Sequence, residues 1–282
     1  MLFRFDNLIL NERLKSHGEH DSVGSTAVCA FIDKSDIVIA NLGDSRAILI
    51  ADDIKFTTLD HKPKISGERT RIESTGRSVI DKRVCGLNMS RAFGSVANKV
   101  KLDENRQPIA TLAEVKAVES KPDIDKIPRR SGYRFLVIVS DGVTDALKCA
   151  ETTIDKIINE QLKLTNDLKK VSTAILNFCL SYCLNCSDNM TLILIALEKL
   201  DEKVDEKAVA ADAAFEEEIK GQVLRLLESE EVKKKGWQPL DYYRHVRQNL
   251  RNPREICFKI TFITDIVKKY GRDVLAVDIV YP

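Results

Sequence analysis

The sequence predicts an α+β fold, an αββα sandwich in which two mainly antiparallel sheets pack together and are flanked by helices. Three observations lead to this prediction. Short β-rich runs separated by turns occupy the first part of the chain. Two almost entirely apolar strands follow at 135–140 and 190–197. Helical periodicity separates these two strands and returns in a C-terminal extension, which we expect to be mainly helical.

The early β-rich runs lie at 26–32, 36–42 and 47–51, and turns separate them. Short strands at this spacing predict an antiparallel meander. A loop then leads into a helix within 63–76, and residues 79–89 return to strand-like alternation. The first half of the chain is therefore expected to be mainly sheet.

The later elements carry stronger signals. Residues 135–140 form an apolar run between two glycines, which predicts a strand covered on both faces. A helix follows, and another is expected at about 168–184, where Cys179 falls on the buried face. The stripe that faces the core of the first of these helices contains Ile154, Ile157, Ile158 and Leu162. Residues 190–197 complete this part of the chain as a second apolar strand.

We expect one domain over residues 1–198 and a separate extension over 199–282. Residues 201–235 are rich in Glu, Lys and Ala and predict an amphipathic helix that packs on the domain or on a partner protein. The apolar face of this helix contains Phe215, Ile219, Val223, Leu226 and Leu227. A solvated helix face is our preferred interpretation of the next basic stretch, and a docking surface for an acidic partner or a phosphosubstrate is the alternative. Its cations are Arg244, His245, Arg247, Arg251 and Arg254. Residues 274–280 predict a final strand.

Composition narrows the class of protein. The chain has 282 residues, of which 44% are hydrophobic and 31% are charged, and this excludes a disordered chain. No apolar run approaches the ~20 residues that span a bilayer. The net charge of +1 gives no electrostatic reason to expect nucleic acid as a partner.

The seven cysteines are scattered and odd in number, which favours reduced thiols and an intracellular, cytoplasmic or nuclear, location. We find no secretory signal at the start of the sequence. Cys179, Cys183 and Cys186 are close in sequence, but no second Cys pair or nearby His pair completes a zinc site. Buried core cysteines are therefore the preferred interpretation of this group.

Acidic residues stand at turns that follow hydrophobic runs. Asp44 follows the run 37–42, Asp141 follows 135–140, and Asp188 precedes the last apolar strand. Strand ends that direct carboxylates into one cleft are a usual way to build a site for Mg²⁺ or Mn²⁺, which prefer oxygen ligands. The alternative is that these aspartates only cap turns or helices, because Gly-Asp and Asp-Gly are also common turn dipeptides.

The order of the surrounding motifs resembles the metal-dependent protein serine/threonine phosphatases of the PPM, or type 2C, family. The matching segments, in chain order, are Gly24-Ser25-Thr26-Ala27, residues 40–47, Asp60-His61-Lys62-Pro63, residues 68–72, residues 87–94, residues 139–145 and residues 187–191. This resemblance implies phosphate monoester hydrolysis of phosphoserine and phosphothreonine proteins by a water that Mg²⁺ or Mn²⁺ activates. It also implies that Asp141 and Asp188 are metal ligands, and that Asp44 and Asp145 contribute to a weaker metal site with Asp141.

Two departures from the family pattern affect the expected activity. The resemblance implies an early acidic strand followed by Asp-Gly-His-Gly, which carries the bridging aspartate and the general-acid histidine, and the sequence has no such motif. Ser95 stands where the family usually has aspartate. We therefore expect an N-terminally incomplete domain, we assign no separate catalytic residue, and we expect impaired phosphatase activity. A catalytically inactive pseudophosphatase that serves as a scaffold or binding module is the alternative.

Three other residues in the matching motifs have a structural explanation that we prefer. Arg46 and Arg91 are expected to form salt bridges inside the domain more readily than to bind phosphate. His61 precedes Pro63 in a turn and is expected to hydrogen-bond the backbone there.

Overall fold

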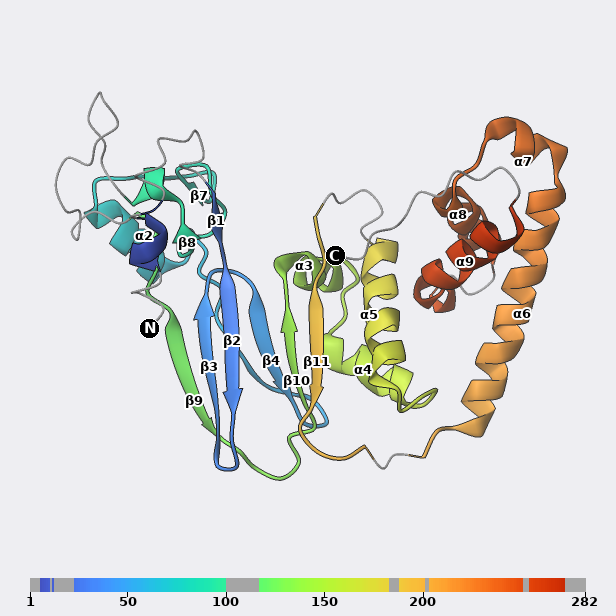
Figure 1. Ribbon diagram of the computed structural model, residues 1–282, viewed down its shortest axis with the longest axis horizontal. Coiled ribbons are helices and arrows are strands. Elements are labelled where there is room, and N and C mark those ends of the chain that lie inside the picture. The colour runs from blue at the N-terminus through green and yellow to red at the C-terminus, as the bar shows by residue number, and fades with distance from the viewer. Residues whose placement is uncertain are drawn as a thin grey trace. The chain divides into compact units, whose positions relative to one another are not determined.

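The computed structural model describes residues 6–10, 12, 23–99, 117–182, 188–200, 203–250 and 254–271, which belong to two compact units (Figure 1). The first unit covers residues 1–141 and the second covers 142–282. Each unit is described separately below.

One sheet of the first unit has the strand order β2-β3-β9 and is antiparallel throughout. Its strands are β2 (Ala27–Ile32), β3 (Asp36–Leu42) and β9 (Asp123–Pro128). Alternate residues of the central strand β3, Ile37 and Ile39, are fully buried, as expected for a strand with one face on the core. The hairpin between β2 and β3 confirms the first two strands of the predicted meander.

The third strand of the predicted meander belongs to a different sheet, so the prediction of one continuous meander was wrong. β4 (Arg46–Ile50) pairs in antiparallel fashion with β5 (Ile54–Thr57) and with β10 (Phe135–Val139), not with β3. Between β3 and β4 the chain turns at Gly43, whose φ is 111°. A Cβ at this position would lie 2.4 Å from the Thr26 side chain, so the turn requires glycine. Hydrophobic periodicity identifies strands, but it does not show which sheet each strand joins.

Both β4 and β10 lie in the core, as the prediction for 135–140 required. Ala47, Leu49 and Ile50 of β4 are fully buried, and so are Phe135, Leu136 and Val137 of β10. The remaining elements of this unit are short: β1 (Gly24–Ser25), α2 (Ser66–Ser74), β6 (Val79–Ile80), β7 (Arg83–Val84), β8 (Phe93–Gly94) and the 3-10 helix η1 (Val96–Asn98). β1 pairs with β8 and β6 with β7.

The second unit contains α3 from its second residue onward (α3 spans Asp141–Cys149), α4 (Ile154–Leu162), α5 (Leu168–Tyr182) and β11 (Leu192–Ala196). The predicted stripe of α4 is confirmed, because all four of its members, Ile154, Ile157, Ile158 and Leu162, are buried. Cys179 of α5 is fully buried, in agreement with a core thiol. Cys183 and Cys186 lie outside the described residues.

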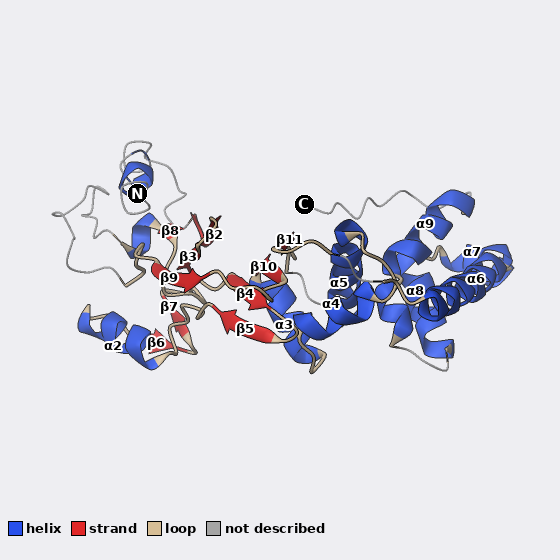
Figure 2. Cartoon of the chain, turned by 90° about the horizontal axis from the view of Figure 1, so that it is seen from below, coloured by secondary structure: helices blue, strands red, loops and turns tan. Residues whose placement is uncertain are grey.

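The C-terminal extension is helical, as predicted, and Figure 2 shows its helices in blue. It consists of α6 (Glu206–Glu228), α7 (Glu230–Lys235), α8 (Pro239–Asn249), the 3-10 helix η2 (Glu255–Phe258) and α9 (Ile260–Tyr270). Ile219 and Val223 of the predicted apolar face of α6 are fully buried and share a core with α8 and α9. The strand predicted at 274–280 lies outside the described residues.

The extension packs on α5, within the same unit. Arg247 Nη1 donates to the Ser181 carbonyl at 2.7 Å, and Asn177 Nδ2 donates to the Phe258 carbonyl at 3.1 Å. The rings of Phe178 and Phe258 stack with their centroids 5.2 Å apart. In the described part of the chain, none of the helices has the length and apolar character needed to cross a bilayer.

Candidate active site

Asp44 and Asp141 lie at the same end of the β4–β10 ladder. The last residue of β10, Val139, pairs with the first residue of β4, Arg46. Asp44 precedes Arg46 by two positions, and Asp141 follows Val139 by two positions. Because the two strands are antiparallel, both chain segments leave the sheet at one edge. The register of these two buried strands therefore places Asp44 and Asp141 at the same end of the sheet.

Asp44 is buried, with 2% of its surface exposed. One of its carboxylate oxygens accepts a hydrogen bond from the Lys62 ammonium, which forms a salt bridge with it. The neighbouring Ser45 hydroxyl is 3.0 Å from the Thr26 hydroxyl. The Asp44 charge therefore already has a partner inside the protein.

The other three aspartates are more accessible. Asp141 opens α3 and is partly exposed, and Asp145 lies one turn later, exposed, with the Lys148 ammonium 2.7 Å from its carboxylate. Asp188 is exposed and precedes β11. Within the residues that the structure describes, no group of three or more His, Cys, Asp or Glu side chains is arranged to hold a metal ion.

Gly142 brings the start of α3 close to the segment that carries Asp188. A Cβ on Gly142 would lie 2.7 Å from the Asn189 carbonyl oxygen and 3.3 Å from the Met190 side chain. Any larger residue would force the two segments apart. The residue after Asp141 is thus in contact with the residue after Asp188, although the two lie far apart in sequence.

His61 makes the backbone hydrogen bond that the sequence predicts, and a second bond as well. The ring nitrogen Nδ1 of His61 accepts a hydrogen bond from the Gly43 N–H at 2.9 Å. The backbone N–H of His61 donates to the Gly43 carbonyl at 2.9 Å. Since Nδ1 is an acceptor, the proton resides on Nε2, which lies 3.1 Å from Asp123 Oδ2. His61 is 3% exposed, so it is a structural residue of the turn.

Arg46 and Arg91 are confirmed as internal salt-bridge residues. Arg46 contacts Asp60 through two bonds, Nε to Oδ1 at 3.0 Å and Nη2 to Oδ2 at 2.8 Å. Arg91 contacts Glu68 Oε1 through Nη2 at 2.6 Å and Asp123 Oδ1 through Nη1 at 2.8 Å. Both guanidinium groups are committed to carboxylates of the first unit.

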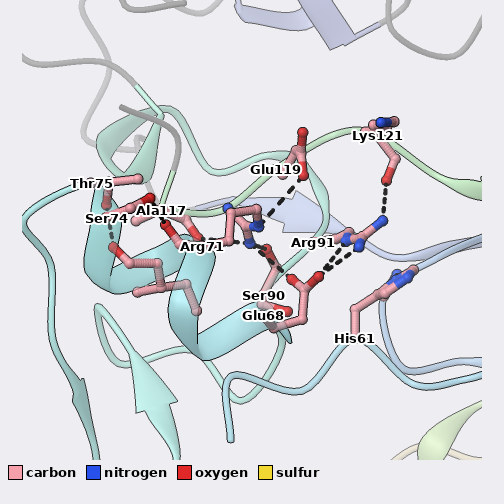
Figure 3. Close-up of polar contacts among 12 residues, drawn as sticks. His61, Glu68, Arg71, Ser74, Thr75, Ser90, Arg91, Ala117, Glu119 and Lys121 are labelled. Atoms are coloured by element: carbon pink, nitrogen blue, oxygen red, sulfur yellow. Dashed lines mark hydrogen bonds and ion pairs between the residues drawn. The ribbon is translucent and has the colours of Figure 1, made fainter. Parts of the chain in front are cut away.

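Glu68 lies at the centre of this network (Figure 3). Arg91 binds one of its oxygens, and Arg71 Nη2 binds the other at 2.9 Å. Burial by itself would raise the pKa of Glu68, but the hydrogen bonds to its carboxylate, of which the one from Arg91 has the largest effect, outweigh burial and lower the pKa to about 2. Burial also opposes ionisation of Asp123, yet the bond from His61 and the charge of Arg91 hold the pKa of Asp123 below its ordinary value.

Sequence reasoning missed the buried ion pair between Asp6 and Lys99. Both side chains are fully buried, and Lys99 Nζ lies 2.9 Å from each carboxylate oxygen of Asp6. Asp6 also accepts the Gly94 N–H at 2.8 Å. Ser95, the residue that departs from the family pattern, follows directly with a positive φ of 52° and 2% exposure. No local sequence pattern links two residues that are 93 positions apart, so this ion pair is apparent only in the tertiary structure.

Comparison with known proteins agrees with these motifs. Residues 4–190 match the family model described as Protein phosphatase 2C. The chain is 34% identical over 190 residues to Protein phosphatase ppm-1.A of Caenorhabditis elegans, covering 67% of this chain and 38% of that protein. It is 31% identical over 210 residues to Protein phosphatase 1B of Rattus norvegicus, covering 74% of this chain and 51% of that protein. The chain thus spans about half or less of the length of these relatives.

Solved structures show the same fold. A sex-determining protein of C. elegans gives a TM-score of 0.53 at 19% identity and covers 74% of this chain and 47% of its own. The serine-threonine phosphatase 2C of Toxoplasma gondii gives 0.51 at 18% identity, with coverage of 68% and 64%. These similarities confirm the predicted fold class of antiparallel sheets flanked by helices. Together with the family match over residues 4–190, they show that the chain belongs to the protein phosphatase 2C family.

Proposed function

We propose that the chain is a metal-dependent protein serine/threonine phosphatase unit with impaired activity. Its substrates are phosphoserine and phosphothreonine proteins, and the reaction is hydrolysis of a phosphate monoester. The observation that carries this proposal is the close approach of Gly142 to Asn189, because it supports a shared role for the aspartates that precede these two residues.

The donor set suits a hard cation in part. Asp141 and Asp188 supply carboxylate oxygens, which Mg²⁺ and Mn²⁺ prefer, and Asp188 is exposed. Asp145 is paired with Lys148 and Asp44 with Lys62, and each of these ammonium groups offsets the negative charge that would attract a cation. A bound metal would supply an activated water and neutralise charge on the phosphoryl group.

The protein's own residues define the rest of the proposed site. Asp141 and Asp188 hold negative charge at chain turns, and Gly142 keeps the second turn near the start of α3. Arg46 and Arg91 stabilise the domain and leave the phosphate to other groups. Impairment is expected because the sequence has one Asp-Gly pair, at 141–142, and Val143 rather than histidine follows it.

The lack of a histidine after the Asp141-Gly142 pair favours the second candidate function, a pseudophosphatase that acts as a scaffold or binding module. Such a protein requires the fold and a protein-binding surface, and the C-terminal extension is a candidate for that surface. An intracellular location is also proposed, supported by the scattered cysteines of the sequence.

The test is turnover of a phosphothreonine peptide by the 282-residue chain in Mn²⁺, with and without EDTA. We expect slow, EDTA-sensitive turnover that Asp141→Asn abolishes, and calorimetry should show weak Mn²⁺ binding that the Asp141→Asn, Asp188→Asn double variant loses. Asp53→Asn is the matched control, because it makes the same change at an exposed position between β4 and β5 and removes none of the proposed ligands. Absence of turnover with Mn²⁺ binding retained would favour the scaffold, and turnover that EDTA does not reduce would contradict the phosphatase proposal.

A further inference from the structure

Two segments of the first unit are joined by two ion pairs and by hydrogen bonds between Gly43 and His61. We call them the clasp and define it as Gly43–Arg46 together with Asp60–Lys62. We propose that the clasp is a positioning device, in which Asp44 is the counter-ion of Lys62 rather than a metal ligand and holds the sheet edge from which Asp141 emerges. The positioning role rests on the proposed function, while the counter-ion role does not.

The charge order of the two segments explains why they fit. Each has an acidic residue, one intervening residue and a basic residue: Asp44 and Arg46 in the first, Asp60 and Lys62 in the second. Because the segments run antiparallel, each acid meets the base of the other. Asp44 pairs with Lys62, and Asp60 pairs with Arg46 through both guanidinium bonds.

Hydrogen bonds that involve backbone groups lie at one end of the clasp and directly beyond its other end. Gly43 exchanges two hydrogen bonds with His61, each 2.9 Å long. Directly beyond the other end, the Thr58 N–H donates to the Ala47 carbonyl at 3.0 Å, and the Ala47 N–H donates to the Thr58 hydroxyl at 3.1 Å. The clasp therefore continues the β4–β5 ladder past the last paired residues of both strands.

The surroundings of Asp44 suit an ammonium better than a divalent ion. A hard cation needs about six oxygen ligands or waters, and Asp44 is 2% exposed. Lys62 already supplies a positive charge there, and a divalent ion beside the ammonium would be repelled. Removing Lys62 would leave the buried Asp44 carboxylate without its partner, which is costly.

The clasp also fixes the position of Asp141. β4 begins at Arg46, one arm of the clasp, and Arg46 pairs with Val139 near the end of β10. His61 also bonds to Asp123 through Nε2, and Asp123 in turn accepts a hydrogen bond from Arg91. The sheet edge next to Asp141 is thus held by charges on one side and by the buried β4–β10 ladder on the other.

The experiment compares Asp44→Asn, Lys62→Met and the double variant, with Mn²⁺ alone as the probe. Calorimetry measures the Mn²⁺ dissociation constant, and urea unfolding in EDTA measures stability without metal. We expect both single variants to unfold at lower urea and the double variant to lose less than the sum of the two losses. Asp44→Asn and Lys62→Met should each weaken Mn²⁺ binding by a similar, small factor of about threefold or less. Asp141→Asn should weaken it by about tenfold or more.

The sign of the Lys62→Met effect separates the two roles of Asp44. If Asp44 were a ligand with which Lys62 competes, Lys62→Met would tighten Mn²⁺ binding and Asp44→Asn would weaken it by about tenfold or more. That pair of results would overturn the proposal. Lys62→Arg, which keeps the charge, is the matched control and should retain most of the wild-type stability.

The outcomes also separate the clasp from the proposed function. If the wild-type chain binds no Mn²⁺, the proposed metal site fails, and additive losses in EDTA would overturn the clasp while non-additive losses would support it. If Asp44→Asn does not fold in EDTA, a role as metal ligand alone is contradicted, and Lys62→Met is expected to show the same failure. A stable Lys62→Met variant in that case would overturn the clasp.

Discussion

The turns of the first unit and the C-terminal extension of the second are stabilised in opposite ways. In the first unit, fully or largely buried carboxylates pair with arginine or lysine, as in Glu68 with Arg91 and Asp6 with Lys99. In the extension, aliphatic and aromatic side chains of α6, α8 and α9 form the core, and Lys259 is the buried cation among its described residues. Most of the other ion pairs of the extension join exposed neighbours on one helix.

The two kinds of interaction contribute differently: buried ion pairs define a geometry, and apolar packing contributes most of the stability. Buried ion pairs lose much of their Coulomb energy to desolvation, but each charge accepts few alternative partners and so defines one geometry. Apolar packing stabilises in proportion to the buried area and tolerates small rearrangements. The turns next to Asp44 and Asp141 require a defined geometry, whereas the extension requires mainly a filled core.

The largest effect is expected from Lys99→Ala in the first unit. Asp6 would keep its fully buried carboxylate without an ammonium partner, and breaking such a pair costs about 3–5 kcal/mol of unfolding free energy. Urea unfolding at neutral pH measures the loss. A variant with wild-type stability would show that Asp6 is not buried and charged, and the Asp6→Asn, Lys99→Met double variant should recover part of the loss.

Glu68→Gln is expected to have the next largest effect and to depend on pH. The pKa of Glu68 falls from 4.5 to about 2 on folding, so the ionised form contributes about 3 kcal/mol. Because the folded-state pKa is the lower one, this contribution is complete above about pH 4.5 and is lost as the pH falls toward 2. Unfolding free energies from pH 6 to pH 2 should therefore converge for the wild type and Glu68→Gln, and a constant difference would contradict the prediction.

The smallest measurable effect is expected in the extension, from Ile263→Val. Ile263 is fully buried in the core of α6, α8 and α9, and loss of one methylene costs about 1 kcal/mol. No titratable group is removed, so the loss should be the same at pH 7 and pH 4, in contrast to Glu68→Gln. Lys233→Ala is the matched surface control, and the midpoint of urea unfolding should not change because its ion pair with Glu230 is exposed. A pH-dependent loss in Ile263→Val would show that charges also stabilise this core.

Local sequence patterns determined most of the secondary structure. The apolar run at 135–140 became β10, and the stripe of α4 is buried as its periodicity predicts. The strand expected at 190–197 is shorter, because β11 covers Leu192–Ala196. Alternation and helical spacing are properties of neighbouring residues, so the sequence alone reports them.

The tertiary structure decided which strands share a sheet and which charges meet. Nothing in the run 47–51 showed that it would leave β3 and pair with β10, because that choice depends on the Gly43 turn and on the packing of buried faces. The same holds for the clasp, since Asp44 and Lys62 are ordinary turn residues until the chain folds back. The motifs and their order were sufficient to predict the family, and the metal-ligand role of the four aspartates stays a prediction. The partners of those aspartates come from residues distant in sequence, and contacts of that kind form only when the chain packs into three dimensions.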